Sequence, residues 1–374
     1  MPAIPAIPAI PALPTPISPE TSSIPADPAK PGATSSSTKT VLPEPVVPPP
    51  VVSAKTATPA IPAASTKPAA PVASVPQTLP SPVRLEISSQ RKYLPDDTQE
   101  LSGETAAALS ETIMKALAAA YPERVGPAEY RNGDWAVPVR GVYYYYAQGK
   151  LLPETLRQQA AAYNPQPFYQ YPAELPPWKT PGPAEAARLK QGAEERRLHP
   201  PKRSQDFYDA LWRAHTKEES YERVKSMRFL GYNILIHYSI MEELSLVEER
   251  IYAAARTDSR VRQWINNLKS VETWNWRTIA ATESRSFHAY GAAIDLLVKT
   301  GSQDVTYWLW TSRLKLDWWA IPYEKRLHPP PAVIKAFEDY GFIWGGKWIW
   351  YDTMHFEYRP EILLLNNLPL SELR

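Results

Sequence analysis

Two short segments of the sequence contain the residue types that bind a catalytic metal ion. In the first, His288 precedes Asp295 by seven residues, with Gly291 between them; in the second, His355 follows Asp352 by three. Two histidines and one carboxylate can bind zinc and leave its fourth position free for water, which is the pattern of catalytic rather than structural sites. We therefore predict that His288, Asp295 and His355 bind one metal ion.

His288 and Asp295 can share a metal ion only if the chain bends between them. The run "AIDLLV", which contains Asp295, has the branched residues typical of a strand. A straight strand would separate the two Cα atoms by roughly 23 Å, at about 3.3 Å per residue. Two ligands of one zinc ion have Cα atoms at most about 11 Å apart. Gly291 can adopt backbone angles closed to other residues, so we predict the bend there.

Asp352 is a carboxylate outside this ligand set. Zinc lowers the pKa of its bound water toward about 7, and a neighbouring carboxylate can accept the proton as that water attacks a carbonyl. A structural site needs no such acid, so we predict that Asp352 is a general base. Glu357 shares a predicted strand face with His355 and either hydrogen-bonds to it or is an ordinary exposed glutamate. The same ligand set also binds iron or manganese.

These segments resemble the signatures of the zinc D-alanyl-D-alanine peptidases, a family that includes VanY-like carboxypeptidases, phage endolysins that cut L-alanyl-D-glutamate bonds, and the zinc domain of hedgehog proteins. The second signature, an acid three residues before a histidine, is met in "DTMHFE". The first signature, S-x-H-x-x-G-x-A-x-D, is met at every fixed position by Ser286, His288, Gly291, Ala293 and Asp295. The likeness extends over roughly residues 205–370 and gives no support to the sequence upstream.

The resemblance implies a zinc peptidase that hydrolyses peptidoglycan stem peptides, with one Zn²⁺ per chain, bound by the two histidines and Asp295. Among the activities of the family, the resemblance favours a D-alanyl-D-alanine carboxypeptidase, with Asp352 as the general base. Ser286 would line the substrate pocket, and Arg277 is our candidate for the arginine that holds the substrate. The implied fold is α+β, with a small, mostly antiparallel sheet under the zinc site and helices at its sides.

Three other functions remain open at this point. The first is an L-alanyl-D-glutamate endopeptidase of the same family. The second is a metal-bearing module that binds the cell wall without catalysis, although the presence of Asp352 speaks against it. The third is a structural envelope protein in which the aromatic and Pro-rich regions do the binding. The substrate of the family places the protein in the cell envelope or periplasm, yet no signal peptide is visible in the sequence as given.

The composition divides the sequence into three parts. Of the 42 prolines, 22 lie in the first 82 residues, and the first aromatic residue is Tyr93. We predict a disordered Pro-rich arm over 1–85, because such a segment has nothing with which to build a core. Residues 86–203 are predicted to form an accessory, partly irregular region with a helix and a hairpin. Residues 204–374 are predicted to form the catalytic domain.

The pattern of apolar residues and turn formers predicts the main elements. We predict a helix that ends before Pro122, strands that turn at Arg140 and Gly141, and a helix over 205–215 capped by Ser204. "MRFLGYNILIHY" is predicted as one strand with a bulge at its glycine, and "ETWNWRTIAA" as the strand that carries Arg277. "PAVIKAFEDYG" is predicted as a helix, and "KWIWYDTMHFEY" as the last strand pair. The tyrosines at 143–146 are predicted to form a strand covered on both faces, and the tryptophans from 308 to 350 a packed core.

Charge and hydropathy narrow the classes of partner. The 41 basic and 39 acidic residues are mixed along the sequence and give a net charge of +2, so we expect no nucleic-acid partner. No apolar run reaches the roughly 18 residues of a membrane span. The sequence has no cysteine, which excludes disulfides and thiolate metal ligands. The oligomeric state is not indicated.

Overall fold

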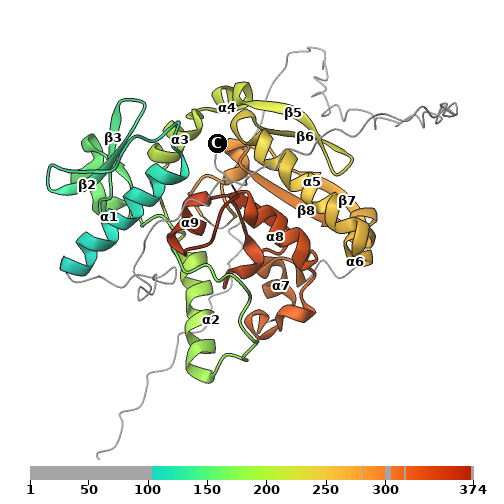
Figure 1. Cartoon of the computed structure of the whole chain (residues 1–374). Helices are drawn as coiled ribbons and strands as arrows, with labels where there is room; N and C mark the ends of the chain where they lie inside the picture. The colour runs from blue at the N-terminus through green and yellow to red at the C-terminus, as the bar shows by residue number, and fades with distance from the viewer. Residues whose placement is uncertain (1–102, 281, 300–304, 316, 372–374) are drawn as a thin grey trace, which may run out of the picture. The chain divides into compact units, whose positions relative to one another are not determined.

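The structure is a computed structural model that describes residues 103–280, 282–299, 305–315 and 317–371, all within one compact unit (Figure 1). The predicted arm over 1–85 lies outside the described residues. The helices are α1 Gly103–Ala120, α2 Pro183–Leu198, α3 Asp206–Trp212, α4 Lys217–Arg223, α5 Met241–Thr257, α6 Ser259–Asn266, α7 Trp308–Leu314, α8 Pro331–Asp339 and α9 Pro360–Leu365. The strands are β1 Glu129–Arg131, β2 Asp134–Val139, β3 Val142–Tyr145, β4 Leu152–Pro153, β5 Val224–Phe229, β6 Tyr232–His237, β7 Leu268–Glu272, β8 Ala293–Val298, β9 Phe342–Trp344 and β10 His355–Tyr358.

The described chain is α+β, as the sequence predicted, with antiparallel pairing in each of its sheets. The sheet that carries the predicted ligands has the order β7-β8-β10-β9. In it, His355 of β10 pairs directly with Asp295 of β8, and Phe356 pairs with Ile294. Because alternate side chains of a strand point to opposite faces, this register places His355 and Asp295 side by side on one face. The apolar residues of "AIDLLV" fill the other positions of β8.

A second sheet, β1-β2-β3-β4, lies in the region before residue 203. The predicted turn at Arg140 and Gly141 joins β2 to β3, and both residues have positive φ angles, 54° and 80°. Tyr144 and Tyr145 are both buried, at 5% and 1% exposure, and point to opposite faces of β3. The strand is therefore covered on both faces, as predicted.

Several predicted elements differ in the structure. The segment 227–238 forms part of the β5–β6 hairpin, because Leu230 and Gly231 both have positive φ angles and make a turn rather than a bulge. β7 ends at Glu272, so Arg277 lies in a loop and not on a strand. Of the segment 347–358, only β10 is a strand. The helix predicted over 205–215 ends at Trp212, and its N-cap is Gln205 rather than Ser204.

One hydrophobic core joins most of the described elements. It runs from Ile113 of α1 to Leu370 near the end of the chain, so side chains from both sides of residue 203 belong to it. Within it, α1 packs against α9 and β2, and α5 packs against α8. A smaller aromatic cluster of Trp308, Trp318 and Tyr351 lies apart, with Trp350 packed against it. The predicted packing of the tryptophans is therefore only partly confirmed, because Trp310 is 39% exposed. Within the described residues, no helix is long and apolar enough to cross a membrane.

Candidate active site

The bend between the first two candidate ligands is made by a short helical turn and a glycine. His288 lies in the 3₁₀ turn Phe287–Tyr290, and the next residue, Gly291, has a left-handed backbone with φ of 68°. A Cβ atom at position 291 would lie 2.5 Å from Cγ1 of Val224 and 2.9 Å from the backbone nitrogen of His237. Glycine is therefore required both by conformation and by space, and the predicted bend is confirmed.

The bend and the strand register bring His288, Asp295 and His355 together. His355 Nδ1 lies 2.7 Å from Asp295 Oδ1, and His288 Nε2 lies 3.2 Å from both Asp295 Oδ2 and His355 Nδ1. One ligand atom from each residue falls within 4.8 Å of the others, close enough to hold one metal ion. Among the described residues, no other group of three histidine or carboxylate side chains meets this condition.

Each histidine is oriented by a contact on the far side of its ring. His288 Nδ1 lies 2.5 Å from the carbonyl oxygen of Thr273, to which it can only donate. His355 Nε2 lies 3.1 Å from Glu357 Oε1 and donates to that carboxylate. The unprotonated nitrogens of neutral rings, Nε2 of His288 and Nδ1 of His355, then face each other beside Asp295. Two nitrogen lone pairs and a carboxylate at this distance can bind a cation that lies between them.

The charges of the site are strongly coupled. Burial alone would raise the pKa of Asp295, but the charge and hydrogen bonds of His288 and His355 hold it well below its usual range. Burial would lower the pKa of His355, yet the hydrogen bonds and charges of Asp295 and Glu357 raise it well above its usual value. A proton on Nδ1 of His355 and a metal ion therefore compete for the same lone pair.

Asp352 has the features of a general base beside this site. Its Oδ1 is buried and has no hydrogen-bond partner among the described residues. Burial raises the pKa of Asp352, and the negative charge of Asp295 adds to this, so that it reaches about 7. The backbone of Asp352 is held by hydrogen bonds from its N–H to Gly345 and from His355 to its carbonyl oxygen. An unpaired carboxylate oxygen costs free energy unless it meets a donor, such as a metal-bound water.

The two predicted substrate-binding residues, Ser286 and Arg277, are joined by a backbone hydrogen bond across one loop. The backbone N–H of Ser286 donates to the carbonyl oxygen of Arg277 at 3.1 Å. Ser286 is buried, and its Oγ accepts a hydrogen bond from the N–H of His288, so the contact that it shows positions the ligand turn. Arg277 is exposed. Burial raises the pKa of Asp352 to about 7 and that of Tyr307 to about 12, and the positive charge of Arg277 opposes part of both increases. The side chain of Arg277 is thus within electrostatic range of Asp352.

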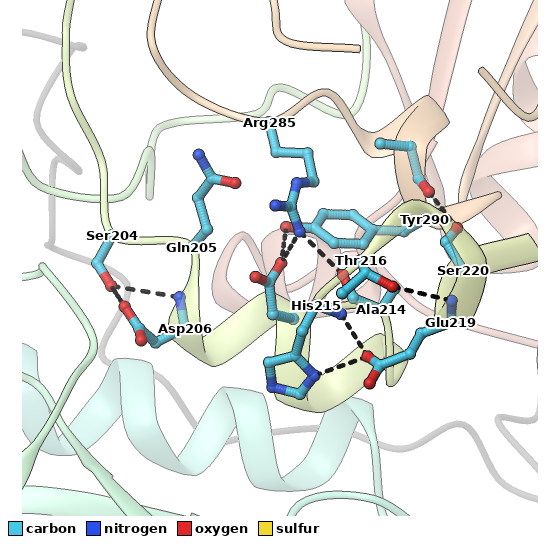
Figure 2. A network of polar contacts seen from close by, with 12 residues as sticks. Ser204, Gln205, Asp206, Ala214, His215, Thr216, Glu219, Ser220, Arg285 and Tyr290 are labelled. Carbon is cyan, nitrogen blue, oxygen red and sulfur yellow. Dashed lines mark hydrogen bonds and ion pairs between the residues drawn. The ribbon is translucent and has the colours of Figure 1, made fainter. Parts of the chain in front are cut away.

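A network of polar contacts that the sequence did not reveal holds the ligand turn in place (Figure 2). Arg285 Nη1 donates to Asp209 Oδ1 of α3 at 2.5 Å and to the carbonyl oxygen of Ala214 at 2.9 Å. Tyr290 OH donates to the same Asp209 oxygen at 2.8 Å, and Ser220 Oγ of α4 donates to the carbonyl oxygen of Ala289. Both ends of the turn are therefore fixed to α3 and α4. The one sequence feature that could have indicated this network is Asp209, an acidic residue within the otherwise largely apolar helix "DFYDALW".

The remaining four histidines lie outside the candidate metal site. His237 ends β6 and is buried, with Nε2 3.1 Å from the carbonyl oxygen of Trp212. His215 was predicted to be helical, but it lies between α3 and α4, where Nδ1 is 3.1 Å from Glu219 Oε2 (Figure 2). His199 follows α2, and His328 contacts the carbonyl oxygen of Pro329.

Two segments of the chain match known family models. Residues 280–358 match a family model described as D-alanyl-D-alanine carboxypeptidase, and this segment contains the three candidate ligands and Asp352. Residues 113–168 match a second model, described as a domain of unknown function. No curated protein and no solved structure matches the chain. The first match supports, at the level of the family, a metallopeptidase of the D-alanyl-D-alanine carboxypeptidase type.

Proposed function

We propose that this protein is a zinc peptidase that removes the terminal D-alanine from peptidoglycan stem peptides. The observation that carries the proposal is the convergence of His288, Asp295 and His355 within 4.8 Å, next to the unpaired Oδ1 of Asp352. The family match over 280–358 covers these residues and supports the reaction class. Because the substrate is part of the cell wall, we also propose that the protein acts in the cell envelope or periplasm.

Each residue of the site would have a separate role in hydrolysis. A bound zinc ion would lower the pKa of its water and polarise the scissile carbonyl. Asp352 is placed to accept the proton of the attacking water and to return it to the leaving amine. In the metal-free protein the pKa of Asp352 is about 7, and a nearby dication favours the ionised form that a base requires. Glu357 holds the ring of His355, and Thr273 holds that of His288.

Arg277 is the candidate for substrate recognition. Its exposed side chain lies within electrostatic range of Asp352, and its backbone carbonyl oxygen accepts a hydrogen bond from the N–H of the buried Ser286. A carboxypeptidase substrate ends in a carboxylate, and an arginine binds that group through two parallel hydrogen bonds. We therefore assign the terminal carboxylate, or the scissile carbonyl next to it, to Arg277.

The test is digestion of a synthetic stem pentapeptide with the purified full-length protein, followed by mass spectrometry. Loss of one alanine in the presence of Zn²⁺, abolished by a chelator and by Asp352→Asn, is the expected result. Asp258→Asn, which alters the cap of α6 and the ion pair of Asp258 with Arg260, is the matched control and should cleave normally. Release of a fragment that begins with D-glutamate would show the endopeptidase instead. Metal binding without cleavage of any wall peptide would leave the non-catalytic binding module.

A further inference from the structure

Beyond His355, a line of charged side chains leads away from the candidate metal site. His355, Glu357 and Arg359 alternate along the chain from β10 to the residue before α9. Alternate residues of an extended segment share one face, so these three side chains lie on the same side. Phe356 points to the opposite side, where it stacks on Phe337 with ring centroids 4.0 Å apart. The apolar side chain thus anchors the segment in the core, and the polar side chains face the candidate metal site.

Contacts along this line connect the candidate ligand His355 to Tyr121, the residue after α1. Glu357 Oε1 lies 3.1 Å from His355 Nε2, and Glu357 Oε2 lies 3.8 Å from Arg359 Nη1. Arg359 Nε donates to Glu361 Oε1, and Tyr121 OH donates to Glu361 Oε2 at 2.8 Å. We call Glu357, Arg359, Glu361 and Tyr121 the Arg359 network.

The Arg359 network is almost completely out of water. Arg359 is 1% exposed, Glu361 0% and Tyr121 1%. The guanidinium of Arg359 also donates to the carbonyl oxygen of Pro167 and lies 5.0 Å from the centre of the Phe287 ring. Removing one partner from buried charges leaves the other uncompensated, so each member depends on the next for its orientation.

We propose that the Arg359 network positions His355 for metal binding, and that Tyr121 is its outer anchor. The inference rests on the proposed function only in taking His288, Asp295 and His355 as the metal site. Glu357 can aim Oε1 at His355 Nε2 because Arg359 attracts Oε2, and Arg359 is itself held by Glu361. The contact with Glu357 fixes the ring of His355 so that Nδ1 faces the site.

This assignment gives a role to the segment that matches the domain of unknown function. Tyr121 lies in that segment, just after α1, and is separated from Glu361 by 240 positions in the sequence. Its ring packs edge-on against Trp212, with centroids 6.1 Å apart. The segment therefore contributes one hydroxyl group to the support of a metal ligand that lies outside it.

Tyr121→Phe is the critical variant, because it keeps the packed ring and removes only the donor to Glu361. Loss of a direct partner of a metal-bound histidine lowers metal affinity by about 10- to 100-fold, which we expect for Glu357→Gln. Tyr121 acts on His355 only through Glu361, Arg359 and Glu357, so we expect a smaller loss, about three- to tenfold, for both Zn²⁺ and Co²⁺. We expect the visible absorption bands of the Co²⁺-loaded protein to shift as well.

Tyr171→Phe is the matched control. Tyr171 is also buried and donates to a glutamate, the half-buried Glu338, and it accepts a hydrogen bond from the N–H of Trp344. Among the described residues, Tyr171 and Glu338 show no contact with Glu357 or Arg359. Affinities are measured by competition with a chromogenic chelator, and urea unfolding of the metal-free proteins measures the structural cost. Similar stability losses with weaker metal binding only in Tyr121→Phe support the proposal. Equal metal affinities in Tyr121→Phe, Tyr171→Phe and the wild type overturn it. If the wild type binds neither metal at the three ligands, the proposed function falls too.

Discussion

Replacement of Gly291 by alanine tests whether the bend between His288 and Asp295 is the feature on which the site depends. The substitution places a Cβ in a left-handed conformation, which costs about 1–2 kcal/mol. The new methyl group would also lie 2.5 Å from Val224 Cγ1 and 2.9 Å from the His237 nitrogen. The nitrogen cannot retreat freely, because its N–H donates to the carbonyl oxygen of Gly291 itself. Overpacking of this kind adds about 1–3 kcal/mol.

Gly231→Ala separates the two costs. Gly231 also has a positive φ, 88°, but a Cβ there would have nothing within 4 Å. We expect Gly231→Ala to lower the free energy of unfolding by about 1–2 kcal/mol and Gly291→Ala by about 2–5 kcal/mol. Urea unfolding of the metal-free proteins measures both values. Gly291→Ala should also weaken Zn²⁺ binding, because the turn that carries His288 must shift, whereas Gly231→Ala should not. Equal losses of stability, or unchanged metal affinity in Gly291→Ala, would refute the reasoning.

Three further predictions concern Asp352 and the metal. Asp352→Asn should lower the cleavage rate by about 100- to 10,000-fold, the usual effect of losing a general base, while Zn²⁺ affinity is retained; a fast variant would remove Asp352 from the mechanism. The folded-state pKa of Asp352 is about 7 and its ordinary value is 3.8, so the folded metal-free protein binds the proton more tightly. Its contribution to stability is therefore present below pH 3.8 and is lost as the pH rises toward 7, and Asp352→Asn should be more stable than the wild type at pH 8 by urea unfolding. Zn²⁺ at a hundred times its dissociation constant should stabilise the wild type by about 2.7 kcal/mol, a shift that His288→Ala must lack if the ligands are assigned correctly.

The spacing of the ligands and the strand pattern around Asp295 indicated more of the site than of the fold around it. Gly291 could be placed at the bend because no straight element joins His288 to Asp295, and the structure shows the left-handed backbone there. The approach of His355 to Asp295 follows from the pairing of β10 with β8, which the sequence pattern suggested only as a small antiparallel sheet.

Other features depend on information that a sequence pattern does not contain. Residues 227–238 were interpreted as one strand because apolar and branched residues flank Gly231 on both sides, and that pattern does not distinguish a bulge from a tight turn. Arg277 was placed on a strand because the tryptophans before it favour strands, although β7 ends at Glu272. The partner of His288 Nδ1 is a backbone carbonyl, which every residue has. The pairing of Tyr121 with Glu361 joins distant parts of the chain.

Because His355 pairs directly with Asp295, metal binding depends on the correct register between β10 and β8. A slip of one residue would turn His355 away and bring Phe356 into its place, because side chains alternate between the two faces of a strand. A misaligned molecule would then have lost a ligand and exposed an aromatic ring that now packs on Phe337. Only molecules with the correct alignment could be locked by the ion, so metal supply during folding would select them from the misaligned ones.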